Sequence, residues 1–329
     1  RLARFVYRSG PVMKPVLDTA KRNLKRVVLA EGEDERVLRA AQTLVDEKLA
    51  FPVLVGRDYV INQRIKQLGL RLESGKSIEI IHGQASHQQQ AVEQEYFEMM
   101  SRSGVTMAMA REKMRSRPTL IAAMYLRRGY VDALLCGMRG TYEEHLRYIR
   151  EVIPCRSGVT TLAAMNLLML TERQLFICDT YVNRDPSAEQ IAEMTLLAAE
   201  EVRRFGITPR VALLSHSSFG SSSSPEAAKM RKAAAILADT APGLEVDGEM
   251  RGDVALMPQT LHNLMPDTRL THGANLLVMP SVDAANIAYN LLKVTSSNNI
   301  TVGPILIGTS KPAHILEPTA STRRIVNMA

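Results

Sequence analysis

Short apolar runs rich in β-branched residues alternate along this chain with longer stretches in which apolar residues recur every three or four positions. The first pattern is typical of strands that are buried on both faces, and the second of amphipathic helices. Their alternation predicts βαβ units, and therefore an α/β fold of two three-layer, parallel-sheet domains. The predicted strands are residues 26–30, 51–56, 78–81, 133–137, 174–178, 210–215, 275–280 and 301–308, and the predicted helices include 1–21, 91–100, 118–128, 187–205, 225–238 and 282–294.

The length of 329 residues corresponds to roughly two domains at about 150 residues each. We expect a first α/β domain over residues 1–150, a second over 151–297, and a return of residues 298–329 to the first domain. Hydrophobic residues make up 46% and charged residues 23%, which excludes a disordered chain. No run of about 18 apolar residues occurs, so no membrane partner is expected. The chain begins with Arg1, and we expect it to be part of a longer polypeptide.

The net charge is +7, from 41 basic and 34 acidic residues, which favours an anionic partner. Basic residues are spread along the whole chain and tryptophan is absent, so the clustered charge and stacking aromatics of a nucleic-acid surface are missing. A phosphorylated small molecule fits this composition better than nucleic acid. Cys136, Cys155 and Cys178 have no metal-ligand spacing, and we expect reduced thiols in a cytoplasmic protein without a metal site in this chain.

A loop rich in serine and glycine follows the predicted strand 210–215 and precedes a helix that Pro225 opens. Ligands bind at such strand-to-helix turns in α/β sheets, and small residues let backbone N–H groups approach an anion. The loop therefore predicts a phosphate-binding site, and the alternative is a flexible surface loop with a serine cap. The candidate contacts are Ser215, Ser217, Ser218, Gly220, Ser221 and, on the following helix, Lys229.

Two further groups of polar residues have competing interpretations. Asp247, Glu249 and Asp253 lie within seven residues and are candidates for metal binding or acid–base catalysis. We favour a loop in which these carboxylates cap helices and pair with arginines. Arg147 follows the strand 133–137 and is placed to clamp a phosphate, whereas nearby His145 is interpreted as structural rather than as a base.

The order of these segments along essentially the whole chain resembles the phosphate acetyltransferase (phosphotransacetylase) family. The resemblance implies a topology like that of isocitrate and isopropylmalate dehydrogenases, with a cleft between the two domains. More narrowly, the chain resembles the phosphotransacetylase-like C-terminal part of hybrid NADP-dependent malic enzymes. The segments that carry the resemblance are 29–38 (LAEGEDERVL), 131–137 (VDALLCG), 211–217 (VALLSHS), 247–253, 273–280 (GANLLVMP), 285–289 (ANIAY) and 303–308 (GPILIG), with 5–8, 13–15, 179–183, 203–207 and 323–328 for the narrower match.

The segment after the last of these motifs departs from the active family, which carries a Ser-Arg pair there. In this chain Glu317 and Pro318 occupy those two positions, and Arg324 occupies the position of an aspartate that assists the thiol. Met100 replaces a further family arginine, and Arg147 matches a phosphate-clamping one. Acetyl transfer must orient a dianion and stabilise an oxyanion. The resemblance therefore implies a chain that has no catalytic residues and is nearly inactive as a transferase.

A cleft that binds coenzyme A can persist in a chain that has lost the residues for acetyl transfer. The resemblance implies that it holds acetyl-CoA or CoA, with acetyl-CoA an allosteric inhibitor of an attached malic-enzyme domain, which converts malate to pyruvate with NADP and Mg or Mn bound in that domain. It also implies a homodimer formed through the second domain, residues 151–297, and a hexamer in the parent enzyme. Two alternatives stay open: an active transferase with a rearranged site in which His314 and Arg324 stand in for the lost groups, and a purely structural oligomerisation module. The further candidate contacts are Asn286, Tyr289, Lys293, Lys311, His314 and Arg324.

Overall fold

The computed structural model describes residues 13–81, 87–170, 172–295 and 300–329. Contacts within the chain divide it into two compact units. The first unit holds residues 17–157 and 309–329, and the second unit holds residues 158–308 with the described residues that precede position 17. The predicted boundary between residues 150 and 151 thus lies a few residues before the observed one, and the boundary between 297 and 298 falls outside the described residues. The same is true of residues 1–12 of the predicted first helix, whereas residues 13–22 are helical.

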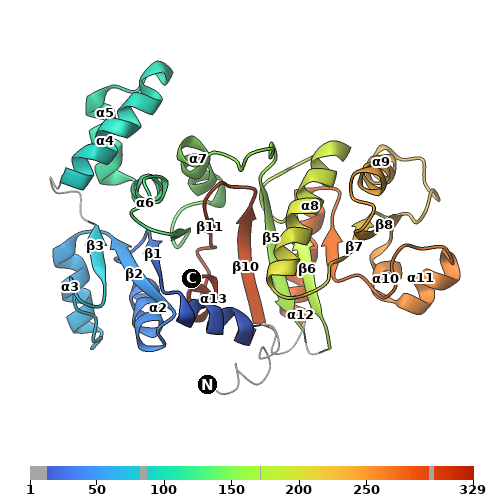
Figure 1. Ribbon diagram of the computed structural model, residues 1–329, viewed down its shortest axis with the longest axis horizontal. Coiled ribbons are helices and arrows are strands. Elements are labelled where there is room, and N and C mark those ends of the chain that lie inside the picture. The colour runs from blue at the N-terminus through green and yellow to red at the C-terminus, as the bar shows by residue number, and fades with distance from the viewer. Residues whose placement is uncertain (1–12, 82–86, 171, 296–299) are drawn as a thin grey trace. The chain divides into compact units, whose positions relative to one another are not determined.

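The first unit is built on a five-stranded sheet whose strands all run parallel, in the order β11-β4-β1-β2-β3 (Figure 1). Helices cover both faces, as a parallel sheet requires because its strands are apolar on both sides. The strands are β1 (Lys25–Leu29), β2 (Ala50–Val55), β3 (Glu79–Ile81), β4 (Ala133–Cys136) and β11 (Ala313–Ile315). The helices are α2 (Glu35–Asp46), α3 (Asp58–Gln67), α4 (His87–Met100), the short 3-10 helix η1 (Ser101–Ser103), α5 (Met107–Ser116), α6 (Pro118–Arg127), α7 (Tyr142–Val152) and α13 (Thr322–Met328).

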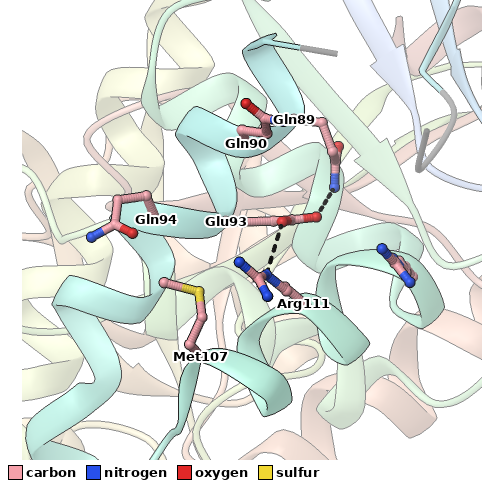
Figure 2. A pocket seen from close by; sticks show the side chains of 7 residues that line it. Gln89, Gln90, Glu93, Gln94, Met107 and Arg111 are labelled. Atoms are coloured by element: carbon pink, nitrogen blue, oxygen red, sulfur yellow. Dashed lines mark hydrogen bonds and ion pairs between the residues drawn. The ribbon is translucent and has the colours of Figure 1, made fainter. Parts of the chain in front are cut away.

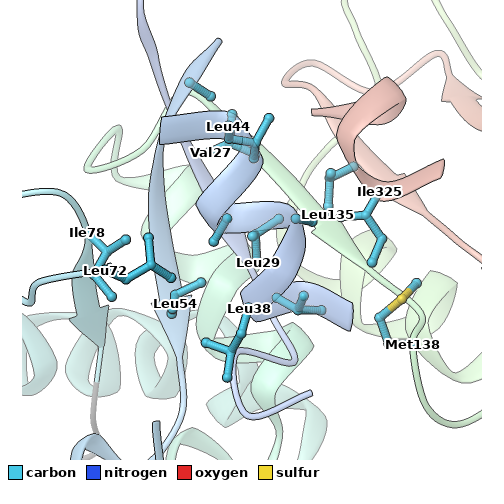
Figure 3. Close-up of a cluster of buried hydrophobic side chains, with 14 of the residues drawn as sticks. Val27, Leu29, Leu38, Leu44, Leu54, Leu72, Ile78, Leu135, Met138 and Ile325 are labelled. Atoms are coloured by element: carbon cyan, nitrogen blue, oxygen red, sulfur yellow. The ribbon is translucent and has the colours of Figure 1, made fainter. Parts of the chain in front are cut away.

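The main core of the first unit lies between this sheet and helices α2, α3 and α13. Leu38 and Leu44 of α2 are fully buried in one cluster with Leu29 of β1 and Leu54 of β2 (Figure 3). Each such leucine contributes roughly 2 kcal/mol through the apolar surface that it removes from water. Helix α2 begins at Asp34, whose side chain accepts the N–H of Arg36, so the acidic run before the helix serves as its cap.

The second unit contains a six-stranded mixed sheet in the order β10-β5-β6-β9-β7-β8 (Figure 1). The prediction of a purely parallel sheet is corrected here, because β5 pairs antiparallel with both β10 and β6 while the other pairs are parallel. The strands are β5 (Ala163–Met169), β6 (Gln174–Cys178), β7 (Arg210–Leu214), β8 (Glu245–Met250), β9 (Leu276–Val278) and β10 (Ile300–Ile307).

The last long strand of the sequence, β10, lies in this second sheet, whereas the sequence assigned it to the first domain. Its partner β5 explains the difference. Strand β5 is buried at every position but is composed of Ala, Met, Leu and one Asn, so it lacks the β-branched signature of the other strands. Because β5 was not recognised as a strand, the sequence offered no strand of the second sheet with which β10 could pair.

Two layers of helices cover the second sheet. Helices α8 (Ala188–Arg204) and α9 (Pro225–Thr240) pack on each other, α8 also on β6, β9 and β10, and α9 on β7 and β8. Helices α10 (Gly252–Leu256), α11 (Pro258–Leu264) and α12 (Val282–Thr295) contribute Val254, Leu261, Ala285 and Tyr289 to a core cluster on the other face. This arrangement confirms the predicted α/β fold. No helix in the described ranges is both long and apolar enough to cross a membrane.

Gly137 follows β4 at a point where the chain approaches β11 very closely. Its φ is +101°, and a Cβ placed on it would lie 2.2 Å from the carbonyl oxygen of Leu316. Gly104 has a similar φ of +82° but no atom within 4 Å of its Cβ position. We expect Gly104→Ala to lose about 1 kcal/mol of unfolding free energy from backbone strain alone, and Gly137→Ala to lose several kcal/mol because β4 and β11 must separate. Urea unfolding of both variants tests this, and equal losses would contradict it.

Candidate functional site

The carboxyl ends of β1, β4 and β11 meet at one edge of the first sheet, which is the edge where ligands bind in this architecture. Glu31 follows β1, Gly137 follows β4 and Glu317 follows β11. The carboxylate Oε1 of Glu31 accepts the N–H of Gly137 at 3.0 Å, and the N–H of Leu316 donates to the carbonyl of Cys136 at 2.7 Å. Segments far apart in the sequence therefore build one polar edge.

Glu317 and Arg324 form an ion pair at this edge. The Arg324 guanidinium donates to Oε2 of Glu317, and the side chains are only 7% and 16% exposed, respectively. Helix α13 places Arg324 there, because Ser321 caps the helix by accepting the Arg324 N–H. Both candidate residues are therefore brought together, and each neutralises the other.

Arg36 ties the loop after β11 to the ends of the neighbouring strands. Its guanidinium donates to the carbonyls of Pro318 at 2.5 Å, Ala320 at 3.1 Å and Met138 at 3.2 Å, and it pairs with both oxygens of Asp34. Arg36 was not predicted as a site residue. Its only signal was its place at the end of the acidic run that caps α2.

A pocket of about 130 Å³ lies beside Glu31, and its lining side chains come from the segments that follow β1 and β4, from the end of α5 and from helices α6 and α7. His145 is buried there, with Nδ1 2.7 Å from Oγ1 of Thr119 and Nε2 2.5 Å from the carbonyl oxygen of Arg139. Since a carbonyl only accepts, Nε2 carries the hydrogen and Nδ1 accepts from the Thr119 hydroxyl. Burial also lowers the pKa of His145. This geometry favours the structural interpretation of His145 over a catalytic base. The lining residues are Glu31, Ser116, Arg117, Pro118, Thr119, Arg139, Glu144, His145 and Tyr148.

Glu31 titrates close to neutral pH. Burial is the largest cause and raises its pKa to about 7, against the opposing hydrogen bonds from the N–H groups of Gly137 and Met138. Glu33, two residues later, has the opposite environment, because hydrogen bonds and charge from Arg57 lower its pKa to about 2. Two neighbouring glutamates thus differ in protonation at physiological pH.

The other candidates of the first unit lie apart from this ion pair. Arg147 is exposed on α7, with its guanidinium 4.9 Å from the centre of the Tyr148 ring. The Lys311 ammonium donates to the carbonyl of Leu126 at 2.9 Å, so it supports the end of α6. His314 lies within β11, opposite Leu135 of β4.

In the second unit, the serine-rich loop after β7 is organised by Glu249, which is fully buried on β8. Its Oε1 accepts the Ser217 hydroxyl at 2.6 Å, the Gly220 N–H at 3.0 Å and the Arg231 guanidinium at 2.9 Å. Burial acts to raise the pKa of Glu249, but these bonds outweigh it and leave the pKa below its ordinary value. The sequence predicted a loop at Glu249, whereas Glu249 lies in strand β8. The acidic residues of β8 prevented its recognition as a strand.

The backbone donors of this loop are largely used within the protein. The N–H of Ser218 donates to the Ser221 hydroxyl, that of Ser221 to the Ser218 carbonyl, and that of Gly220 to Glu249. These three groups are therefore not available to cradle a phosphate in this conformation. Ser215 continues the β7 chain, and its N–H donates to the Met250 carbonyl. The Lys229 ammonium contacts Asp185 at 2.6 Å and the Pro280 carbonyl at 2.9 Å.

The remaining candidates lie on α12. The Asn286 amide donates to the carbonyl of Thr180 at 3.1 Å, and Tyr289 is fully buried in the core. The Lys293 ammonium lies 5.4 Å from the centre of the Tyr289 ring. Asn286 and Lys293 are both partly accessible, so they remain candidates for contact with a ligand.

A larger pocket of about 480 Å³ lies between α4 and α5 and was not predicted (Figure 2). Glu93 lies at its centre, 3.2 Å from the Gln89 amide nitrogen and 3.9 Å from Nε of Arg111. Arg115 and the amides of Gln90 and Gln94 also line it. Among the described residues, no group of three His, Cys, Asp or Glu side chains is placed to hold a metal ion.

Replacing Glu31 by glutamine should change how stability depends on pH. A raised pKa in the folded state means that the wild-type carboxyl stabilises the fold while protonated and loses that contribution as the pH rises from about 4.5 to about 7. The unfolding free energy of Glu31→Gln should therefore rise relative to wild type by up to about 3 kcal/mol across this window and then level off. Denaturant unfolding from pH 4.5 to 8 measures it.

Glu33→Gln is the matched control for this titration. With its pKa held near 2, Glu33 is ionised in the folded state throughout that range, and its offset from wild type should stay nearly constant above pH 5. A Glu31→Gln profile parallel to that of wild type would show that burial of Glu31 does not raise its pKa.

The ion pair of Glu317 and Arg324 should show strong coupling in a double-mutant cycle. Removing either partner leaves a buried charge unmatched, so Glu317→Gln and Arg324→Met should each cost about 3 kcal/mol, while the double variant should cost clearly less than their sum. The exposed pair Glu35–Arg39 provides the control, with coupling expected below about 0.5 kcal/mol. Thermal and urea unfolding give both cycles. Additive losses at Glu317 and Arg324 would refute the pairing.

The fold and these contacts can be compared with known proteins. Residues 11–329 match the family of phosphate acetyl/butaryl transferases. The chain is 50% identical over its whole length to the NADP-dependent malic enzyme of Escherichia coli and 47% identical to the NAD-dependent malic enzyme of Rhizobium meliloti, but it spans only 43% of each. It is 30% identical to the phosphate acetyltransferase of Clostridium acetobutylicum, with 96% of both chains covered.

Solved structures show the same relationship. The phosphotransacetylase of Streptococcus pyogenes superposes with a TM-score of 0.88 at 26% identity, covering 96% of this chain and 95% of that one. The EutD phosphotransacetylase of Staphylococcus aureus gives a TM-score of 0.83 at 27% identity, with 96% of both chains covered. The resemblance drawn from the sequence is confirmed, including its narrower form. This chain belongs to the phosphate acetyl/butaryl transferase family and corresponds to the phosphotransacetylase-like part of the malic enzymes.

Proposed function

We propose that this chain is a regulatory and assembly module that binds acetyl-CoA and lowers the activity of an attached malic-enzyme domain. The module itself does not transfer acetyl groups. Two findings support the proposal: the match to malic enzymes of more than twice the length of this chain, and its membership of the family of phosphate acetyl/butaryl transferases. The attached domain would oxidise and decarboxylate malate to pyruvate, with NADP and Mg or Mn supplied there.

The ion pair between Glu317 and Arg324 is the observation that carries this proposal. The family resemblance assigns a hydroxyl and a cation to positions 317 and 318 of an active transferase, and this chain has a carboxylate and a proline. A carboxylate repels the acetyl phosphate dianion, and Pro318 has neither a guanidinium nor an N–H to offer. Since one lost stabilising contact costs on the order of 3 kcal/mol in the barrier, several lost contacts leave little catalysis.

Arg324 is not free to replace the missing cation. Its guanidinium is committed to Glu317, and it is nearly inaccessible at 7% exposure. The Pro318 carbonyl is in turn held by Arg36. These contacts hold the loop that contains Glu317 and Pro318 in one well-packed conformation.

Recognition of acetyl-CoA requires fewer groups than its chemistry does. Arg147 is exposed on α7, so it offers a positive charge that the Tyr148 ring orients but does not neutralise. Such cations suit the phosphates of a nucleotide coenzyme. Inhibition then requires that acetyl-CoA binds more tightly to the inhibited state of the parent enzyme than to its active state.

Titration calorimetry of this chain with acetyl-CoA tests the proposal. We expect saturable binding, with affinity reduced about tenfold in Arg147→Ala because this variant loses a charged contact worth roughly 1.4 kcal/mol. Arg71→Ala is the control, since this exposed arginine pairs with Asp46 at the C-terminal end of α2. Neither heat nor a shift in thermal stability at millimolar acetyl-CoA would overturn the proposal.

A working phosphate acetyltransferase is the second candidate function. Its support is the 30% identity over 96% of the length of the Clostridium acetobutylicum enzyme of that name. In that case His314 and Arg324 would replace the missing groups. Thioester formation from acetyl phosphate and CoA decides between the two functions: turnover at an ordinary enzymatic rate, abolished in Arg147→Ala, would establish the transferase and refute the inactive module.

A further inference from the structure

The pocket between α4 and α5 is lined by one face of helix α5, while another face of this helix is buried. Ala110 and Met114 are fully buried and attach α5 to the first unit. Met107, Arg111 and Arg115 line the pocket, and their spacing of four residues places them on one side of the helix. The volume of about 480 Å³ lies within the range of sites that bind small molecules.

The two arginines of this pocket make little use of their guanidinium groups inside the chain. Nε of Arg111 lies 3.9 Å from the nearest oxygen of Glu93, which is beyond hydrogen-bond distance. Within the described ranges, Arg115 forms no hydrogen bond or ion pair. Arg127 of the next helix, by contrast, donates to Glu95 at 2.9 Å. Two like charges four residues apart also destabilise a helix, so the pair is better explained by an anion that binds between them.

The charge of the two arginines favours a phosphate group over a single carboxylate. A guanidinium holds either anion through two parallel N–H groups. A phosphate monoester carries about two negative charges at neutral pH and has three terminal oxygens, so it can accept from two guanidinium groups at once. Arg111 and Arg115 lie about one helical turn apart, and a single phosphate between them would receive both.

Glu93 restricts which phosphorylated molecules suit the pocket. Its carboxylate is only 12% exposed, accepts from the Gln89 amide at 3.2 Å and points toward Arg111 (Figure 2). A carboxylate at this place repels a bare phosphate ion but accepts a hydroxyl group. The amides of Gln90 and Gln94 line the same pocket and can also exchange hydrogen bonds with hydroxyls. The side chains therefore favour a phosphate that is attached to a skeleton with hydroxyl groups.

We infer that the pocket between α4 and α5 is a binding site for a sugar phosphate. Arg111 and Arg115 hold the phosphate, and Glu93 with the neighbouring amides accepts the hydroxyl groups of the sugar. The site shares no residue with the acetyl-CoA contact proposed at Arg147, and the inference does not depend on whether acetyl-CoA binds. It gives the chain a place to bind a second metabolite.

Titration calorimetry of the full 329-residue chain with ribose 5-phosphate tests the site. We expect saturable binding, with affinity reduced about tenfold or more in Arg115→Gln because a charged contact with the phosphate is lost. Arg102→Gln is the matched control, since this exposed arginine of η1 is not among the residues that line the pocket. Circular dichroism and thermal unfolding establish that both variants are folded. No saturable binding at millimolar ribose 5-phosphate, or an equal loss of affinity in the two variants, would overturn the inference.

Replacing Glu93 tests the selection for a hydroxyl-bearing skeleton. Glu93→Gln removes the repulsion of phosphate and weakens the acceptor for hydroxyl groups. The ratio of the affinity for ribose 5-phosphate to that for inorganic phosphate should therefore fall about tenfold. A ratio equal to that of the wild type would contradict the role assigned to Glu93.

Two further ligands test the separateness and the class of the site. Arg115→Gln should bind acetyl-CoA as the wild type does, and acetyl-CoA should not displace ribose 5-phosphate. Loss of acetyl-CoA binding in Arg115→Gln would assign the pocket to the acetyl-CoA site and overturn the inference. Tighter binding of aspartate than of ribose 5-phosphate would refute the choice of a phosphate. A wild-type chain that binds ribose 5-phosphate but not acetyl-CoA would refute the proposed function and leave this inference intact, so the two failures are distinguishable.

Discussion

A carboxylate that leaves water must be matched by hydrogen-bond donors or by a cation, and this requirement organises the polar edges of both sheets. Glu317 is matched by Arg324, Asp34 by Arg36, and Glu249 by Arg231 together with a serine hydroxyl and a backbone N–H. Glu31 accepts hydrogen bonds from backbone N–H groups, but burial outweighs them and raises its pKa to about 7. The loops at these edges hold their conformations because the carboxylates beneath them are matched.

This internal matching bears directly on what the chain can do. An active transferase keeps its cation and hydroxyl available to the substrate, and it holds them ready for the charge that develops in the transition state. Here the corresponding loop is occupied by an internal ion pair and by the contacts of Arg36. Exposed cations such as Arg147 lie outside these pairs. This arrangement supports the proposed function, in which an anion is recognised without being transformed.

Much of the fold could be predicted because most strands are uninterrupted apolar runs. Apolar runs of this kind predicted strands β1, β2, β4, β6, β7 and β9. Apolar residues that recur every three or four positions predicted helices α6, α8, α9 and α12. Strand β8 was missed because Asp247 and Glu249 lie within it, and their partners come from other parts of the chain. Strand β5 was missed because alanine, methionine and leucine do not distinguish a strand from a helix. Since β5 pairs antiparallel with both of its neighbours, the second sheet is mixed rather than parallel.

The sequence by itself determined the α/β class and the family, and the resemblance predicts that Glu317 and Pro318 replace a hydroxyl and a cation. These properties depend on residue types and on spacing along the chain, which periodicity and motifs record. Only the tertiary structure decided that Arg324 neutralises Glu317, that Arg36 holds a loop 282 residues away, and that Glu249 supports the serine-rich loop. Such pairings depend on which strands become neighbours in a sheet. The strand order brings together residues that lie far apart in the sequence, and nothing in the sequence indicates that they are in contact.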